Sequence, residues 1–296
     1  MKYLLSVSLV FFATQVLAQK MKLAGVEYVN YPKVKVKDDG EDFEVAFQEF
    51  LVYANYPKVL KNKKTVLING FSYAFVKSQL YNDNLSIDNS EIFHRIAYTI
   101  TAIHRWDEDW TLSARLAPTL ASDFEEKFSK DDFILQGSLL AVKNLNQYKK
   151  FGGGLIYTTR LGKPFLLPAV QYYYEKDKHY FHAFFPAFID YAYHAGAKEK
   201  LDLGFRIGIN GSNFNVGQST YTNAEVDRLN YVRVNIGPTI TYKLTKMLQL
   251  EAFGGLNAKR IYKFEDAQGN TFDFDSERSP FINIGLTVVP DRKRKN

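Results

Sequence analysis

The stretch LDLGFRIGIN, residues 201–210, alternates strictly between two kinds of residue. Its odd-numbered positions are all apolar, and its even-numbered positions carry Asp202, Arg206, Asn210 or a glycine. Successive side chains of a β-strand point to opposite faces of the sheet. The period of two therefore predicts a strand with one apolar face and one polar face.

The same alternation appears in WTLSARLAPTLA (110–121), NYVRVNIGPTITY (230–242) and FINIGLTVV (281–289). The faces opposite the apolar ones carry glycine, threonine, serine and asparagine with single arginines, whereas a soluble sandwich would present many lysines to water. A narrow, enclosed polar interior accounts for that composition. We therefore predict an all-β fold, an antiparallel transmembrane β-barrel, with a soluble periplasmic β-sandwich as the alternative.

Runs of this kind predict about twelve strands, an even number as in bacterial barrels. We expect strands near 43–54, 64–77, 91–105, 109–121, 132–143, 150–161, 164–175, 178–190, 200–210, 227–243, 247–263 and 279–289. With both chain ends on the inner side, residues 211–226 and 264–278 become outward loops and 244–247 becomes a tight inward turn. The segment SQLYNDNLSIDNS, 78–90, becomes a long inward turn in this scheme.

The composition agrees with an exported barrel. Aromatic residues make up 16% of the chain, and outer-membrane barrels place aromatic girdles at both membrane interfaces. Past residue 18, no apolar run reaches the roughly 20 residues that a spanning helix needs. The chain contains no cysteine, which excludes a disulfide framework and a cysteine-linked lipid anchor. The formal net charge of +6 is modest for this length and does not indicate a nucleic-acid partner.

The chain begins with a positive residue, Lys2, followed by an apolar run and a small-residue cleavage signal. This order predicts a secretory signal peptide over residues 1–18. We expect residues 19–40 to form a periplasmic N-terminal segment, 41–290 the outer-membrane barrel, and 291–296 a basic tail.

In YYYEKDKHYFHAFF, residues 172–185, four charged residues separate two aromatic blocks. This pattern predicts a hairpin turn between two strands. Amphipathic aromatic rings are favoured at a membrane–water interface, so we expect the flanking rings to lie there, with a ligand cage as the alternative. These interface residues are Tyr172, Tyr173, Tyr174, Tyr180, Phe181, Phe184 and Phe185.

Arginines recur in the polar phase of separate predicted strands, at Arg95, Arg115, Arg160, Arg206 and Arg233. Acidic residues in the same phase are fewer, namely Asp202 and Glu251, with Glu49 as a further candidate. Arginine keeps its charge even in a confined lumen. The arginines therefore either pair with the acids and brace a closed lumen, or leave surplus positive charge that favours anions, as rings of arginine do in anion pores.

Catalytic, metal and cofactor sites are not predicted. His179 and His182 are three residues apart, which places them on opposite faces of a strand, so they cannot share a metal ion. A barrel hydrolase would need a nucleophile and a base within hydrogen-bond reach. Ser113 lies on the polar face and His94 on the apolar face of neighbouring predicted strands, so we expect no enzyme, and a barrel hydrolase is the least favoured alternative.

The chain resembles an uncharacterised outer-membrane β-barrel family found mostly in Bacteroidota, and so in Gram-negative cells. The resemblance rests on PKVLKNKKTVLINGFSY (57–73) and YKLTKMLQLEAFGGLN (242–257) and extends over most of the sequence after residue 18. It implies a barrel but brings no activity with it. One departure is that many such barrels end on an aromatic residue that the insertion machinery reads, whereas here the last strand ends at Val288 and Val289 and is followed by Pro290.

These observations together predict an outer-membrane barrel that acts as a narrow, porin-like passive channel or transport protein for small anionic solutes. The alternative is a closed barrel with a structural or surface-interaction role. Its expected partners are outer-membrane lipid, lipopolysaccharide and the barrel-assembly machinery.

Overall fold

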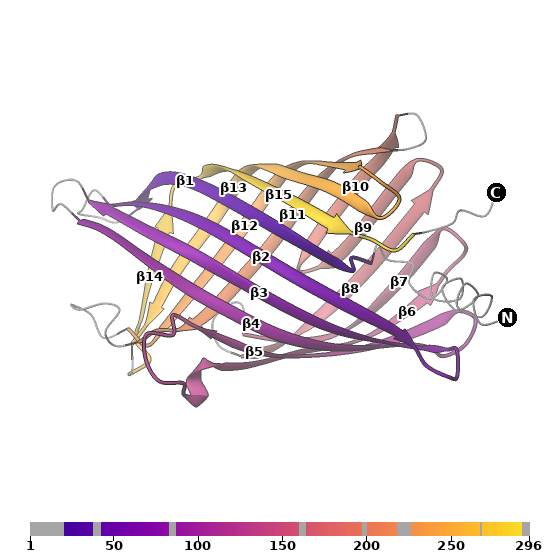
Figure 1. Cartoon of the computed structure of the whole chain (residues 1–296), viewed down its shortest axis with the longest axis horizontal. Helices are drawn as coiled ribbons and strands as arrows, with labels where there is room; N and C mark the ends of the chain where they lie inside the picture. Colours follow the sequence, from indigo (N-terminus) through magenta and orange to yellow (C-terminus); the bar gives the residue numbers. More distant parts are fainter. Residues whose placement is uncertain are drawn as a thin grey trace.

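The computed structural model describes residues 21–37, 43–82, 87–159, 164–196, 200–217, 226–266 and 268–291. They form one antiparallel sheet that curls into a closed barrel of steeply tilted strands (Figure 1). The strands are β1 (Ala24–Lys37), β2 (Glu44–Val59), β3 (Thr65–Asn82), β4 (Ile87–Arg105), β5 (Trp110–Ser122), β6 (Phe133–Asn144), β7 (Lys149–Thr158), β8 (Phe165–Lys176), β9 (His179–Phe185), β10 (Phe188–Ala195), β11 (Leu201–Asn215), β12 (Arg228–Lys243), β13 (Leu248–Glu265), β14 (Thr271–Ser276) and β15 (Ser279–Val288). A short 3-10 helix, η1 (Lys130–Asp132), precedes β6.

The first and last strands close the barrel. β1 pairs with β2 on one edge and with β15 on the other, where Ala24 lies opposite Val288. β14 and β15 both pair with β1 and with β13, and they follow one another along the same position in the wall. The wall therefore has fourteen strand positions, with β14 extending the last of them. The predicted antiparallel barrel of about twelve strands is confirmed.

Three strands were missing from the sequence-based count. One of them, β14, lies within residues 264–278, so the expectation that this segment is an outward loop is corrected. Residues 24–37 were expected to belong to a periplasmic N-terminal segment, 19–40, but they form β1, and that expectation is corrected. The register irregularity between Tyr31 and Val34, next to Pro32, interrupts the alternation that would have revealed this strand.

The third missing strand comes from the predicted run 178–190, which is in fact two strands. Pro186 has no backbone N–H for a sheet ladder, and the chain turns there, with the Ala187 N–H donating to the Phe184 carbonyl at 2.7 Å. β9 and β10 result. The presence of β1 before β2 also reverses the side on which the β3–β4 connection lies. This connection is at the end of the barrel opposite the chain ends, so the expected long inward turn at 78–90 is wrong. β3 runs to Asn82 and β4 starts at Ile87.

The barrel has two distinct ends. We call the end that holds Ala24 and Val288 the terminal end, and its connections are short, such as Asp177–Lys178 between β8 and β9. We call the opposite end the loop end, which carries the longer connections 123–132 and 216–227. The predicted signal peptide at 1–18 lies outside the described residues, as does all of the predicted basic tail except Asp291.

The two faces of the wall follow the predicted alternation. In β11, Leu203 and Phe205 are exposed on the outside while Asp202 is buried inside. The outer surface of the barrel carries many large exposed apolar side chains, such as Leu139 at 64% and Leu166 at 58% exposure. Exposed apolar surface on this scale marks contact with lipid or with another apolar surface. Among the described residues, no helix has both the length and the apolar character to cross a membrane.

Aromatic side chains fill the lumen toward the loop end. We call this cluster the aromatic plug, and its largest members are Tyr31, Phe47, Phe93, Phe214, Leu229 and Tyr231, each at most 1% exposed. Phe47 stacks on Tyr231 with ring centroids 4.5 Å apart, and Phe93 packs against Phe214 at 5.3 Å. The plug occupies the lumen between β1–β5 on one side and β11–β13 on the other.

The wall is shorter at the β9–β10 hairpin, which does not extend as far toward the loop end as β11 does. Beyond Gly208, its last residue paired with β10, β11 continues to Asn215 and there pairs with Ser122 of β5. Residues 211–214 of β11 are buried on both faces. The far end of β11 has therefore moved inward, so that its outer face lies against the inner faces of β5–β8.

The lumen as candidate functional site

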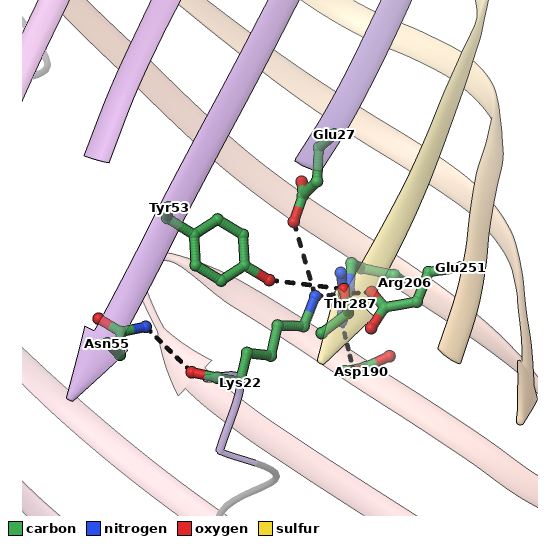
Figure 2. Close-up of polar contacts among 8 residues, drawn as sticks. All are labelled: Lys22, Glu27, Tyr53, Asn55, Asp190, Arg206, Glu251 and Thr287. Carbon is green, nitrogen blue, oxygen red and sulfur yellow. Dashed lines mark hydrogen bonds and ion pairs between the residues drawn. The ribbon is translucent and has the colours of Figure 1, made fainter. Parts of the chain in front are cut away.

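A network of charged residues lines the lumen at the terminal end (Figure 2). The Lys22 ammonium contacts Glu251 Oε2 at 2.6 Å and Glu27 Oε1 at 3.6 Å. Arg206 Nη2 donates to Asp190 Oδ2 at 2.8 Å. We call the cavity beside these groups the vestibule, which has a volume of about 290 Å³. Two cations meet three carboxylates here, so this network carries one surplus negative charge.

The position of Lys22 follows from the backbone just before β1. Its carbonyl accepts a hydrogen bond from Asn55 Nδ2 at 3.0 Å, and the next residue, Leu23, donates its N–H to the Val288 carbonyl at 2.7 Å. Both contacts hold the chain at the mouth of the barrel. The lysine side chain reaches from there into the lumen (Figure 2).

A second polar cluster lies at the rim of the terminal end. His194 Nδ1 lies 2.7 Å from Asp202 Oδ1, and Lys243 Nζ lies 3.5 Å from the same oxygen. His194 and Asp202 are 5% and 3% exposed. Asp202 is therefore fully engaged in the wall and is not free to attract a passing cation.

Farther toward the plug, Arg233 of β12 contacts the carboxylate of Glu49 of β2, across the position where the barrel closes. Arg233 also lies over the ring of Tyr231, at 4.5 Å from the centroid. Arg260, which is 1% exposed, packs between the rings of Tyr31 and Phe47. These two arginines support the side of the aromatic plug that faces the terminal end, through ion-pair and cation–π contacts.

Arg95 and Arg115 differ from the other lumen arginines. No hydrogen bond or ion pair joins either guanidinium to another residue in the part of the chain that the structure describes. The charges that act on Arg95 are those of Arg115 and Arg233, and all of them are positive. This side of the lumen therefore carries uncompensated positive charge.

A second cavity, of about 220 Å³, lies beside Arg115 where β11 has moved inward. We call it the side pocket, and it is enclosed by β5–β8, the β9–β10 turn and the outer face of β11. Phe184 lines the side pocket and Phe188 lines the vestibule, and their ring centroids are 6.0 Å apart. His182 packs edge-on against Phe188 at 4.9 Å. These aromatic rings separate the two cavities.

The structure places the residues singled out in the sequence as follows. Arg95, Arg115, Arg206 and Arg233 lie on the lumen face, as do Asp202 and Glu251, while Arg160 lies outside the described residues. Lys22, Glu27 and Asp190 join the site without having been predicted. Asp190 and Glu27 share the inward phase of their strands, but the strands themselves had been misplaced in the sequence analysis.

The expectation that seven aromatic rings lie at a membrane interface needs correction. Tyr173 and Tyr180 are 5% and 4% exposed and face the lumen, where they pack against each other. Phe184 also faces inward and lines the side pocket. Tyr172, Tyr174, Phe181 and Phe185 alternate with these residues and lie on the outer face. The alternation of a hairpin necessarily divides a continuous aromatic run between the two faces.

The histidines are held by neighbours within the wall. His182 lies 3.0 Å from the Gln171 side chain, and His94 lies 2.9 Å from the Tyr73 hydroxyl on the outer face. Ser113 pairs with Ile103 rather than with a histidine. Among the described residues, no group of three or more histidine or carboxylate side chains could hold a metal ion.

Comparison with known proteins adds a family. The sequence profile described as "Domain of unknown function (DUF6268)" matches residues 14–289. No curated protein matches the chain in sequence.

Several solved barrels are similar to the chain at low identity. An outer membrane channel from Pseudomonas putida F1 has a TM-score of 0.44 and 13% identity, covering 91% of this chain and 96% of that one. A mutant of the TodX monoaromatic hydrocarbon channel has a TM-score of 0.45 and 10% identity, with 95% and 92% covered. Outer membrane phospholipase A from Escherichia coli has a TM-score of 0.33 and 10% identity, with 95% and 97% covered. Similarity at this level carries no functional argument, and the fold of this chain rests on its own strand pairing.

Proposed function

The chain belongs to the DUF6268 family, a domain of unknown function, and we propose that it is a narrow passive channel of the outer membrane for small anionic solutes. The observation that carries the proposal is the charge state of the lumen. Arg206 and Arg233 have carboxylate partners, whereas Arg95 and Arg115 have none among the described residues. Unpaired arginines that line a confined aqueous space favour anions over cations.

The proposed location rests on the outer surface. Its exposed apolar side chains are distributed over the wall, as expected for a barrel that contacts lipid. Export by cleavage after residue 18, assembly by the barrel-assembly machinery, contact with lipopolysaccharide and a source among the Bacteroidota belong to the same proposal.

The proposed route avoids the aromatic plug. A solute enters the vestibule at the terminal end, moves past the paired rings of Phe184 and Phe188, which must part to let it through, and reaches the side pocket beside Arg115. It leaves past the β9–β10 turn, on the side of the loop end, where the wall is shorter. Since this route has an aromatic constriction, the channel is narrow and conducts only small solutes.

Chloride release from proteoliposomes tests the proposal. Liposomes that contain the folded protein should release trapped chloride faster than empty liposomes when valinomycin balances the charge. The double variant Arg95→Gln/Arg115→Gln should release chloride several-fold more slowly, because it lacks both uncompensated cations. Arg278→Gln, which removes an exposed arginine between β14 and β15, serves as the matched control and should behave like the wild type.

Two results would decide against this function. The first is chloride release no faster than from empty liposomes, from protein whose gel mobility shifts on boiling as a folded barrel should. The second is equal release by the wild type and the double variant.

A closed barrel with a structural or surface-interaction role is the second candidate. The aromatic plug favours it, since its largest rings are at most 1% exposed and fill the lumen toward the loop end. In that case Arg95 and Arg115 would line a closed lumen, and folded protein would release no chloride.

A further inference from the structure

The side pocket differs from the rest of the lumen in its construction. It lies between the inner faces of β5–β8 and the outer face of the inward-displaced end of β11. Asn215 anchors this displacement through hydrogen bonds, because its carbonyl accepts from the Asp123 N–H at 3.3 Å and its side chain donates to Asp132 Oδ1 at 2.9 Å. The pocket is therefore held open by the fold itself.

The lining of the side pocket combines one cation with an apolar surface. Arg115 is the only charged residue among those described around it. Ile156, Leu167, Phe184 and Ile209 supply apolar walls, and Ser138 lies beside the arginine. The vestibule is different, because carboxylates outnumber cations there. Glu27, Glu251 and Asp190 surround only Lys22 and Arg206.

This lining selects a class of ligand. A carboxylate would satisfy the guanidinium of Arg115 by charge-assisted hydrogen bonds. An apolar tail of a few carbons would lie against Ile156, Leu167 and Phe184 and remove their surface from water. A cation would be repelled, and a ligand without a charge would leave Arg115 without a partner.

We propose that the side pocket is a binding site for small amphipathic carboxylates, compounds with one carboxylate and a short apolar tail. This inference rests on the proposed function and deepens it, because it names the solute class that the channel would select. The carboxylate binds Arg115 and the tail lies toward Phe184 and the β9–β10 turn.

Calorimetric titration of the folded protein in an uncharged detergent tests the proposal, with hexanoate as the probe. Hexanoate should bind saturably. Hexanamide has the same tail without the charge, and acetate has the charge with almost no tail, so each should bind at least tenfold more weakly. Equal affinities for hexanoate and hexanamide would overturn the proposal, since they would mean that the carboxylate gains nothing from Arg115.

Variants locate the site. Arg115→Gln should weaken hexanoate binding at least tenfold, and Arg115→Lys should restore part of it because the charge returns. Ser138→Phe should block the pocket while keeping Arg115. Arg278→Gln should bind as the wild type does. Unchanged affinity in folded Arg115→Gln protein would overturn the assignment even if Ser138→Phe does not fold.

The titration also separates this proposal from the channel itself, because it needs no membrane. Hexanoate binding by protein that releases no chloride from liposomes would retain the site and contradict the channel. Chloride release by protein that does not bind hexanoate would retain the channel and contradict the site.

Discussion

Arg233 and Glu49 form a buried ion pair in the lumen, next to the aromatic plug on the side of the terminal end. Their side chains are 9% and 13% exposed, and they come from β12 and β2, on either side of the strands that close the barrel. The ring of Tyr231 covers the guanidinium. A charge this far from water needs its partner, because the remaining group would otherwise be buried without compensation.

We therefore predict that Glu49→Gln lowers the free energy of unfolding by about 3–5 kcal/mol, the usual cost of removing one partner of a buried pair. Urea unfolding in lipid vesicles, followed by tryptophan fluorescence, measures this change. The matched control is Asp275→Asn, which removes one partner of the exposed pair between Lys259 and Asp275, 3.7 Å apart. The control should cost no more than about 1 kcal/mol, and equal losses in the two variants would contradict the account.

The strand phase decides on which face of the wall a single residue lies. The polar phase of LDLGFRIGIN and of NYVRVNIGPTITY places Arg206 and Arg233 in the lumen, as alternation requires. Which of the arginines have partners could not be predicted. Glu49 lies 184 positions from Arg233 in the chain, and only the closure of the barrel brings them together.

At the scale of elements, η1 and the connection before it anchor the displaced end of β11. Burial acts to raise the pKa of Asp132, but hydrogen bonds from the Ser129 N–H and from the side chains of Ser122 and Asn215, together with the charge of Arg228, outweigh it. The net effect is a pKa below the usual value. The folded protein therefore favours the charged form of Asp132.

This shift predicts an acid-sensitive anchor. A carboxyl group with a lowered pKa in the folded protein contributes stability above its unfolded pKa of about 3.9, and this contribution is lost as the pH falls through the folded value. Hydrogen exchange of residues 123–132 should therefore quicken, after correction for intrinsic rates, as the pH falls below about 4. Asp132→Asn should show weaker protection without this pH dependence. Unchanged wild-type protection between about pH 5 and about pH 2 would contradict the assignment.

The elements also show where sequence reasoning stops. The charged tetrad Glu175–Lys178 predicted a hairpin, and β8 and β9 form it. The turn at Pro186 was missed because alternation resumes on both sides of it with no change in composition. The inward displacement of β11 has no local sequence signal, since it depends on the short hairpin beside it and on Ser122 in a distant strand.

At the scale of the whole molecule, closure and an enclosed lumen follow from strand number and from the partners of β1. The barrel class could be predicted because outward apolar and inward small or polar residues recur along the whole chain. The aromatic plug could not be predicted. Phe47 and Phe93 are apolar residues at positions where the alternation calls for a polar residue, and only the assembled barrel shows that they pack against the facing strands. The side pocket is likewise a property of the assembled wall.

The most direct test of the central claim is the reversal potential of single channels in a planar bilayer under a potassium chloride gradient. We predict small conductance steps whose reversal potential has the sign of anion selectivity, shifting toward zero in the Arg95→Gln/Arg115→Gln variant because the uncompensated cations are gone. Cation selectivity would contradict the account. Silent membranes containing protein that shows the gel shift of a folded barrel would contradict it as well.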